Sequence, residues 1–149
     1  MKAITLHQPW ASMIAVGAKR IETRAWSTRH RGPLAIHAAK SFPEYAQAFA
    51  LTSRFVRARL DDAELISLKI PFGAIVAVAQ LVEVVPTQTV VDSLSQEERA
   101  LGDYAAGRWA WLLAKIEPLT PPIECRGGVG LWDFFKGRTW DEIRKDIGR

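Results

Sequence analysis

The chain has 149 residues, of which 48% are hydrophobic and 24% are charged. This length predicts one domain with a core that needs no disulfide or metal to hold it. The single cysteine, Cys125, excludes an internal disulfide framework and a cysteine-rich zinc site. No apolar run reaches the roughly 20 residues of a membrane helix, and the N-terminus has no signal-peptide pattern. We therefore expect a soluble, cytoplasmic protein with no metal or other cofactor.

The formal net charge of +4 hides an asymmetry along the chain. Residues 1–60 carry ten lysines and arginines against two acidic residues, whereas residues 61–149 carry ten against fourteen. A basic half favours an anionic partner, and nucleic acid is the commonest one. The alternative is that basic residues of the first half pair with acidic residues of the second half in the folded protein.

Hydrophobic periodicity predicts the elements of the N-terminal half. A helix opens near Gln8, with His7 or Gln8 at its cap and Pro9 in its first turn, and Gly17 ends it. A long helical segment at about 42–69 is predicted as an insert. The predicted strands are 3–6, 20–24 and 33–38, and the predicted helices are 7–17, 42–60 and a short second helix at 61–69.

The C-terminal half is predicted to be mostly strands. Residues 73–85 are rich in valine and alanine, which favours a central strand. Ser95 and Glu98 have the spacing of a capping box at the start of a short helix. The other predicted elements are strands at 109–116, 123–126 and 131–135, a strand-ending segment with Pro118, Pro121 and Pro122, a glycine-rich turn at 127–130, and a terminal helix at 139–147.

The order of these elements predicts the fold class. Regular strand–helix alternation, which a doubly wound parallel sheet needs, is missing from the chain. Several strands with turn signals at short spacing fit a small, mainly antiparallel β-barrel with flanking helices. We therefore expect an α+β fold over residues 1–149.

Charged residues cluster between Gly17 and Arg24. Glu22 and Arg24 are two residues apart on a predicted strand, so both side chains point the same way. Lys19 is out of phase and joins them only if the chain turns at Gly17, which glycine permits. Three converging charges can bind a polar ligand or place a base beside an anion-stabilising group. The alternative is a solvated face with an Arg–Glu pair.

The following loop mixes aromatic, hydroxyl and cationic side chains. Nucleobases stack on aromatic rings such as Trp26, and arginines such as Arg29 and Arg31 contact phosphates. The alternative is that Trp26 packs under the loop as an anchor. Trp109 and Trp111 share one face of a predicted strand, which favours core or cleft wall over recognition surface.

The histidines and the cysteine give no sign of a metal or nucleophile site. His7, His30 and His37 lack the spacing of metal ligands, and Cys125 has no sequence signature of a nucleophile. His37 is predicted to be a structural histidine, with a place in a cleft wall as the alternative. The glycine-rich run at 127–130 is not followed by a helix with Lys-Ser or Lys-Thr, which argues against a phosphate-binding P-loop.

Four segments resemble one known family. Gly17, Lys19, Glu22 and Arg24 match the G-x-K-x-x-E-x-R signature of the ASCH (activating signal cointegrator homology) domains. Residues 7–12, 31–38 and 130–132 also resemble that family and follow in the same order. The resemblance implies a PUA-like β-barrel with a cleft beside the helix that follows the first strand. It also implies RNA binding, with coactivator or translation-related roles.

The resemblance further implies which residues meet the ligand. Lys19 and Arg24 would meet a phosphate or a carbonyl, and Glu22 would accept from a base amino group such as that of cytosine. We expect RNA or a nucleotide as partner, with a protein partner as an alternative. The candidate binding residues are Gln8, Trp10, Lys19, Glu22, Arg24, Trp26, Arg29, Arg31 and Trp132.

Some proteins of this family are enzymes, which gives an alternative function. One branch looks like amidohydrolases that remove an acyl group from N4-acetylcytidine with a lysine, a threonine three residues later and a glutamate. Lys19 matches the lysine, but Glu22 stands at the threonine position and Thr23 should face the other way. Lys19, Glu22 and Thr23 are the candidate catalytic residues, and Glu97 or Glu98 would match the glutamate. A ribonuclease is a further possibility.

Overall fold

Six strands form one sheet in the order β2-β5-β4-β3-β1-β6. The computed structural model describes residues 1–61 and 69–149. The strands are β1 (Lys2–Leu6), β2 (Ile21–Arg24), β3 (Gly32–Ala38), β4 (Ala74–Pro86), β5 (Trp109–Glu124) and β6 (Leu131–Asp133). The helices are α1 (Trp10–Ala15), α2 (Glu44–Thr52), α3 (Arg54–Arg59), α5 (Gln96–Ala100) and α6 (Trp140–Asp146), with 3-10 turns η1 (Thr87–Thr89) and η2 (Val91–Ser93).

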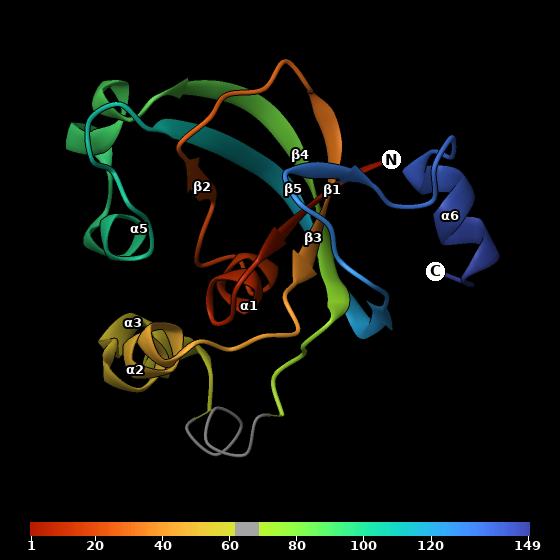
Figure 1. The fold of residues 1–149 in the computed structure, drawn as a ribbon, viewed down its shortest axis with the longest axis horizontal. Coiled ribbons are helices and arrows are strands. Elements are labelled where there is room, and N and C mark those ends of the chain that lie inside the picture. The colour runs from red at the N-terminus through yellow and green to blue at the C-terminus, as the bar shows by residue number, and fades with distance from the viewer. Residues whose placement is uncertain (62–68) are drawn as a thin grey trace.

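The sheet is mainly antiparallel and strongly curled. All neighbouring strands run antiparallel except β1 and β3, which pair in parallel from Lys2–Leu34 to Leu6–Ala38. The long strands β4 and β5 curve around the helix α1 (Figure 1). Because β2 and β6 are the two edges of the sheet, it forms a half-barrel. The predicted α+β fold with a mainly antiparallel, barrel-like sheet and flanking helices is confirmed.

The central strands are buried on both faces. Side chains alternate along a strand, so Ile4 and Ile36 face the cluster that includes α1, while Ala3 and Ala35 face the cluster that includes α6. Figure 1 shows these two helices on opposite sides of the sheet. Trp111 is fully buried in the α1 cluster, as the predicted core face of β5 requires.

The helical insert packs behind α1. Val56 and Leu60 join Met13 of α1 and Leu101 in a third cluster. The single helix predicted at 42–60 is wrong, since the chain forms α2 and α3, which are divided at Ser53. The hydroxyl of Ser53 accepts from the backbone amide of Val56 and caps α3, as serine side chains do at helix starts. The predicted helix at 61–69 falls almost entirely outside the described residues.

Strand β5 does not end at its prolines. The predicted break there is wrong, because β5 continues to Glu124 and its end absorbs the strand predicted at 123–126. Beyond Leu112, the strand partner of β5 is β4 alone, since Leu112 lies opposite Ile21, the first residue of β2. Proline lacks a backbone N–H and is tolerated where a strand edge has no partner. Several register shifts against β4 also bend this part of the strand.

The described helices are all short. Gly17, at a φ of 81°, follows α1 and turns the chain toward β2, which confirms the predicted end of that helix. The terminal helix α6 buries Trp140 and Ile143 against the sheet, as predicted. No helix in the described part of the chain is long and apolar enough to cross a bilayer.

Candidate functional site

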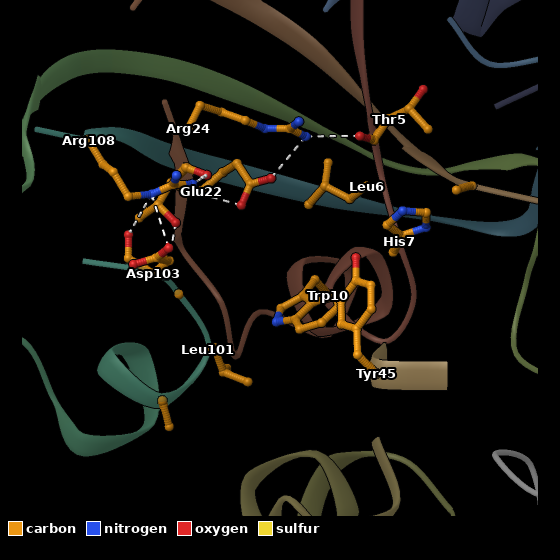
Figure 2. Close-up of a pocket in the computed structure, with 14 residues that line it drawn as sticks. Thr5, Leu6, His7, Trp10, Glu22, Arg24, Tyr45, Leu101, Asp103 and Arg108 are labelled. Carbon is orange, nitrogen blue, oxygen red and sulfur yellow. Dashed lines mark hydrogen bonds and ion pairs between the residues drawn. The ribbon is translucent and has the colours of Figure 1, made fainter. Parts of the chain in front are cut away.

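A cavity of about 540 Å³ lies where α1, α2, the strands β1 and β2 and the loop after α5 meet. Figure 2 shows its side chains: aromatic rings from α1 and α2 lie on one side and charged groups from β2 on the other. We call this cavity the cleft; the residues that line it include Thr5, His7, Trp10, Glu22, Thr23, Arg24, Tyr45, Leu101, Asp103 and Arg108.

Trp10 and Tyr45 form the aromatic side of the cleft. Phe49 stacks on Trp10 at 5.0 Å between ring centroids with 10° between the planes. Tyr45 lies 6.2 Å from Trp10 and stays 63% exposed, and His7 meets the Tyr45 ring edge-on. The insert thus supplies the solvent-accessible ring of Tyr45 beside the ring of Trp10, which is stacked on Phe49. Such a surface can stack a planar ligand.

Glu22 and Arg24 form the polar side. Oε2 of Glu22 lies 3.1 Å from Nη2 of Arg24, which also donates to the backbone oxygen of Thr5 at 2.9 Å. This guanidinium therefore ties the edge strand β2 to β1 across the cleft. Nε of Arg24 is buried and has no hydrogen-bond partner among the described residues. The pair presents an acceptor and a donor next to each other.

Lys19 lies beneath this pair and outside the cleft lining. The side chain is fully buried, and its ammonium group donates to the backbone oxygens of Ile21 at 2.5 Å and Leu101 at 2.8 Å. Oε1 of Glu22 lies 3.6 Å from it. Burial lowers the pKa of Lys19, and the carboxylates of Glu22 and Glu98 oppose that shift. In this structure the ammonium joins β2 to the loop after α5 and does not line the cleft.

Glu98 orients the start of β2. The carboxylate accepts from the backbone amides of Arg20 and Ile21 at 2.9 to 3.2 Å. The predicted capping box is therefore half formed: Ser95 accepts from the backbone amide of Glu98, but the Glu98 side chain reaches another element. Burial, followed by the charges of Glu98 and Glu22, raises the pKa of the nearby Tyr104.

Sequence reasoning missed the wall that follows α5. Arg108 donates to the backbone oxygens of Asp103 and Thr23, and its Nε lies 3.5 Å from a carboxylate oxygen of Asp103. The backbone amide of Asp103 donates to the hydroxyl of Thr23, so this hydroxyl already has a partner. Tyr45 and this loop carried no motif, because they reach the cleft from parts of the chain that lie far from Glu22 and Arg24 in sequence.

Two predicted ligand residues serve other contacts. Gln8 is fully buried and bonds to Ser12 and to the backbone oxygen of Pro71, so it fixes the start of α1, as its predicted place near the cap implies. Trp132 lies in β6, where its indole donates to the hydroxyl of Thr5 at 3.0 Å. Neither residue lines the cleft.

The loop between β2 and β3 also lies outside the cleft lining. Trp26 packs edge-on against Trp111 with 4.9 Å between centroids, although 36% of it is exposed. Arg31 bonds to the backbone oxygens of Thr28 and His30 and pairs with Glu83 of β4 at 2.5 Å. Arg29 is exposed. The structure thus brings together Trp10, Glu22, Thr23 and Arg24 among the predicted site residues.

A second cavity, of about 820 Å³, is also lined by Thr5, whose hydroxyl contacts His37 in the wall of this cavity. Its wall includes His37 and the segment 125–129. Nε2 of His37 lies 3.0 Å from the backbone oxygen of Cys125, which can only accept, so Nε2 carries the proton and Nδ1 accepts from Thr5. Burial lowers the pKa of His37. His37 is therefore a neutral, hydrogen-bonded wall residue.

The backbone of the glycine-rich segment lies close to the rings of His37 and Trp132. A Cβ atom at Gly127 would lie 2.6 Å from the His37 ring, and one at Gly128 would lie 2.7 Å from the Trp132 ring. Only glycine lets this backbone pass over the two rings. Among the described residues, no three His, Cys, Asp or Glu side chains are grouped so that they could hold a metal ion.

The curled sheet with flanking helices is an α+β fold of the PUA-like class. Residues 4–123 match the ASCH domain family, and the chain belongs to it. It is 34% identical over 80 residues to Activating signal cointegrator 1 of Homo sapiens and, with the same values, of Mus musculus. That match covers 54% of this chain and 14% of the relative, so the chain spans a small part of the relatives' length.

Solved structures share the fold. The crystal structure of ASCH from Zymomonas mobilis has a TM-score of 0.56 and 18% sequence identity, covering 99% of this chain and 93% of that chain. A mutant form of the same protein gives a TM-score of 0.55 at 18% identity, covering 99% and 94%. At this identity the likeness concerns the fold alone.

Proposed function

We propose that this protein binds single-stranded RNA and takes one base into the cleft. The observation that carries the proposal is the pairing of an aromatic side, Trp10 and Tyr45, with a polar side, Glu22 and Arg24, across one cavity. Single-stranded RNA is recognised by stacking splayed bases on aromatic rings and by hydrogen bonds to the base edges. The cleft offers both kinds of group.

The polar side favours a base edge that carries a donor next to an acceptor. Glu22 can only accept when ionised, and the partly exposed guanidinium of Arg24 can only donate. Cytosine has an amino donor beside an acceptor nitrogen on its pairing edge, so it fits this arrangement, and carboxylates accept from that amino group. Binding of a cytosine-containing strand is the specific form of the proposal.

The hydrolase alternative has less support from the contacts of its candidate residues. That mechanism needs Lys19 and a threonine to act on the substrate together. Lys19 does not line the cleft and its ammonium donates to the backbone oxygens of Ile21 and Leu101, while the Thr23 hydroxyl accepts from the Asp103 amide. RNA binding is therefore the better-supported function, and hydrolysis of an acylated cytidine, or of RNA, can be monitored in the same experiments.

Substitution of Tyr45 tests the aromatic side. Tyr45→Ala should weaken binding of a fluorescein-labelled oligocytidylate by about tenfold, since stacking contributes about 1–3 kcal/mol per base. Leu51→Ala is the matched control, because Leu51 is a 45% exposed residue of the same helix outside the cleft lining. Fluorescence anisotropy measures both affinities. Equal affinities for the two variants, or no binding by the folded wild-type protein, would overturn the proposal.

Substitution of Glu22 tests the polar side. Glu22→Gln keeps the shape of the side chain but adds an amide donor. The preference for oligocytidylate over oligouridylate should therefore fall by about fivefold or more. This factor is near the lower end of the base discrimination that a bidentate contact contributes. Glu83→Gln is the control, since Glu83 also pairs with an arginine but lies outside the cleft. An unchanged base preference in Glu22→Gln would contradict this role.

A further inference from the structure

We propose that the bound RNA strand leaves the cleft over Thr5 and Ala39 and enters the second cavity, where Lys40 and Arg126 bind its phosphates. This inference rests on the proposed RNA binding. It assigns a second subsite and defines the ligand as an oligonucleotide that spans two cavities, not a free nucleoside.

The two cavities meet along β1. Thr5 and Ala39 line both of them. The backbone oxygen of Thr5 accepts from Arg24 on the cleft side, while its hydroxyl contacts His37 and Trp132 on the side of the second cavity. In Figure 2 the Thr5 side chain points away from the dashed bond to Arg24. The two cavities therefore share a wall at Thr5 and Ala39, and the proposed strand passes over this wall from one cavity to the other.

Lys40 and Arg126 give the second cavity cations that are free to bind. Lys40 follows β3, Arg126 follows β5, and both are exposed. In the described part of the chain neither side chain has a hydrogen bond or ion pair with another residue. Glu124 is the acidic residue of this wall, which leaves one excess positive charge. Since burial lowers the pKa of His37, this histidine adds no charge near neutral pH.

The backbone of the glycine-rich segment adds neutral donors. Gly127 and Gly128 line the second cavity, and their amides donate to no acceptor among the residues that the structure describes. Without side chains the backbone lies against the wall of the cavity. Backbone N–H groups beside cations are common phosphate ligands in nucleic-acid complexes. This gives a chemical reason for a phosphate at this place.

The competing path runs along the loop between β2 and β3. That path would use Arg29 and Arg31, but the Arg31 guanidinium is already bonded to two backbone oxygens and to Glu83. An RNA phosphate there would have to compete with these contacts. The second cavity has no such competition at its two cations, which is why we favour it.

Charge-neutralising variants test the path. Lys40→Gln/Arg126→Gln should weaken binding of a single-stranded hexacytidylate by about tenfold at low salt. It should also reduce the slope of log K against log salt by about 1.4, or roughly 0.7 for each phosphate that is no longer neutralised. Its affinity for cytidine should not change. The charge-matched control is Lys136→Gln/Lys145→Gln, two exposed lysines outside both cavities, which should bind hexacytidylate like the wild type.

The outcomes separate this inference from the proposed function. Hexacytidylate binding that is weakened by Tyr45→Ala but not by Lys40→Gln/Arg126→Gln would overturn the second subsite and leave the proposed function standing. A reduced salt slope in Arg29→Gln/Arg31→Gln with an unchanged slope in the Lys40 and Arg126 variant would assign the path to the loop. A weaker affinity for cytidine in the Lys40 and Arg126 variant would also count against the inference, since the second cavity should not touch the first base.

Discussion

Lys19 shows how one motif residue can act by holding the site together. Burying an ammonium group is costly unless acceptors surround it, and here two backbone oxygens and Glu22 do so. The lysine therefore fixes where β2 lies relative to the loop after α5. It positions Glu22 in the cleft from below and does not line the cleft itself.

This role gives a stability prediction. Lys19→Ala should lower the free energy of unfolding by about 3 kcal/mol, because it strands buried acceptors and leaves a cavity. Lys19→Met should cost less, since it keeps the packing of the side chain. Lys2→Ala, which removes an exposed ion pair with Asp133, should cost less than about 1 kcal/mol. Urea unfolding measures all three. If Lys19→Ala is as mild as Lys2→Ala, the ammonium is not held as described.

At the scale of elements, α5 organises β2. A helix of five residues has little stability of its own, yet its Glu98 carboxylate accepts from two backbone amides that precede or begin β2. Arg59 of α3 in turn pairs with Glu97 of α5. These contacts therefore connect the insert, α5 and β2, which meet around the cleft from different sides.

Adjacent glutamates of α5 give a matched test of this wall. Glu98→Ala should destabilise the protein by about 2 kcal/mol, because it removes hydrogen bonds to a charged group in a buried position, and it should weaken RNA binding by displacing β2. Glu97→Ala removes only the exposed pair with Arg59 and should cost less than about 1 kcal/mol. Urea unfolding and anisotropy provide the two readouts. Equal effects of the two variants would show that Glu98 has no special part in orienting β2.

At the scale of the whole molecule, the charge asymmetry of the sequence is partly neutralised by folding. In the described part of the chain, basic residues of the first half pair with acidic residues of the second half, as Lys2 does with Asp133, Arg31 with Glu83 and Arg59 with Glu97. Arg29 and Lys40 have no such pair among the described residues. Both interpretations of the asymmetry therefore hold for different residues, and the unpaired ones remain available to an anion.

Salt should separate these two groups of charges. Raising NaCl from about 50 to about 200 mM should change the free energy of unfolding by less than about 1 kcal/mol, since the cross-half pairs are partly exposed and weak. The same change should weaken hexacytidylate binding by about tenfold or more, as counterions are released from the strand. Urea unfolding and anisotropy in the same buffers test this. RNA affinity that is insensitive to salt would contradict phosphate binding by the free cations.

The sequence by itself determined most of the strands, the fold class and the charged motif, but not the length of β5. Alternation in β1 and β3 and the valine-rich run of β4 reflect burial, and burial selects residue types locally. The same holds for Gly17, whose position after α1 requires a left-handed backbone. The spacing of Glu22 and Arg24 placed both charges on one strand face, whereas Trp10 was expected in the cleft only from the family resemblance.

Only the tertiary structure decided which groups meet. The distance from Tyr45 or Asp103 to Glu22 along the chain gives no signal of proximity, because curling of the sheet and packing of the insert bring them together. The burial of Lys19 and the reach of Glu98 depend on partners from distant elements. The prolines of β5 are accommodated because its neighbour β2 is short. The length of a neighbouring strand cannot be predicted from the sequence around the prolines. Residue types are set locally, whereas partners are set by how the strands close around α1.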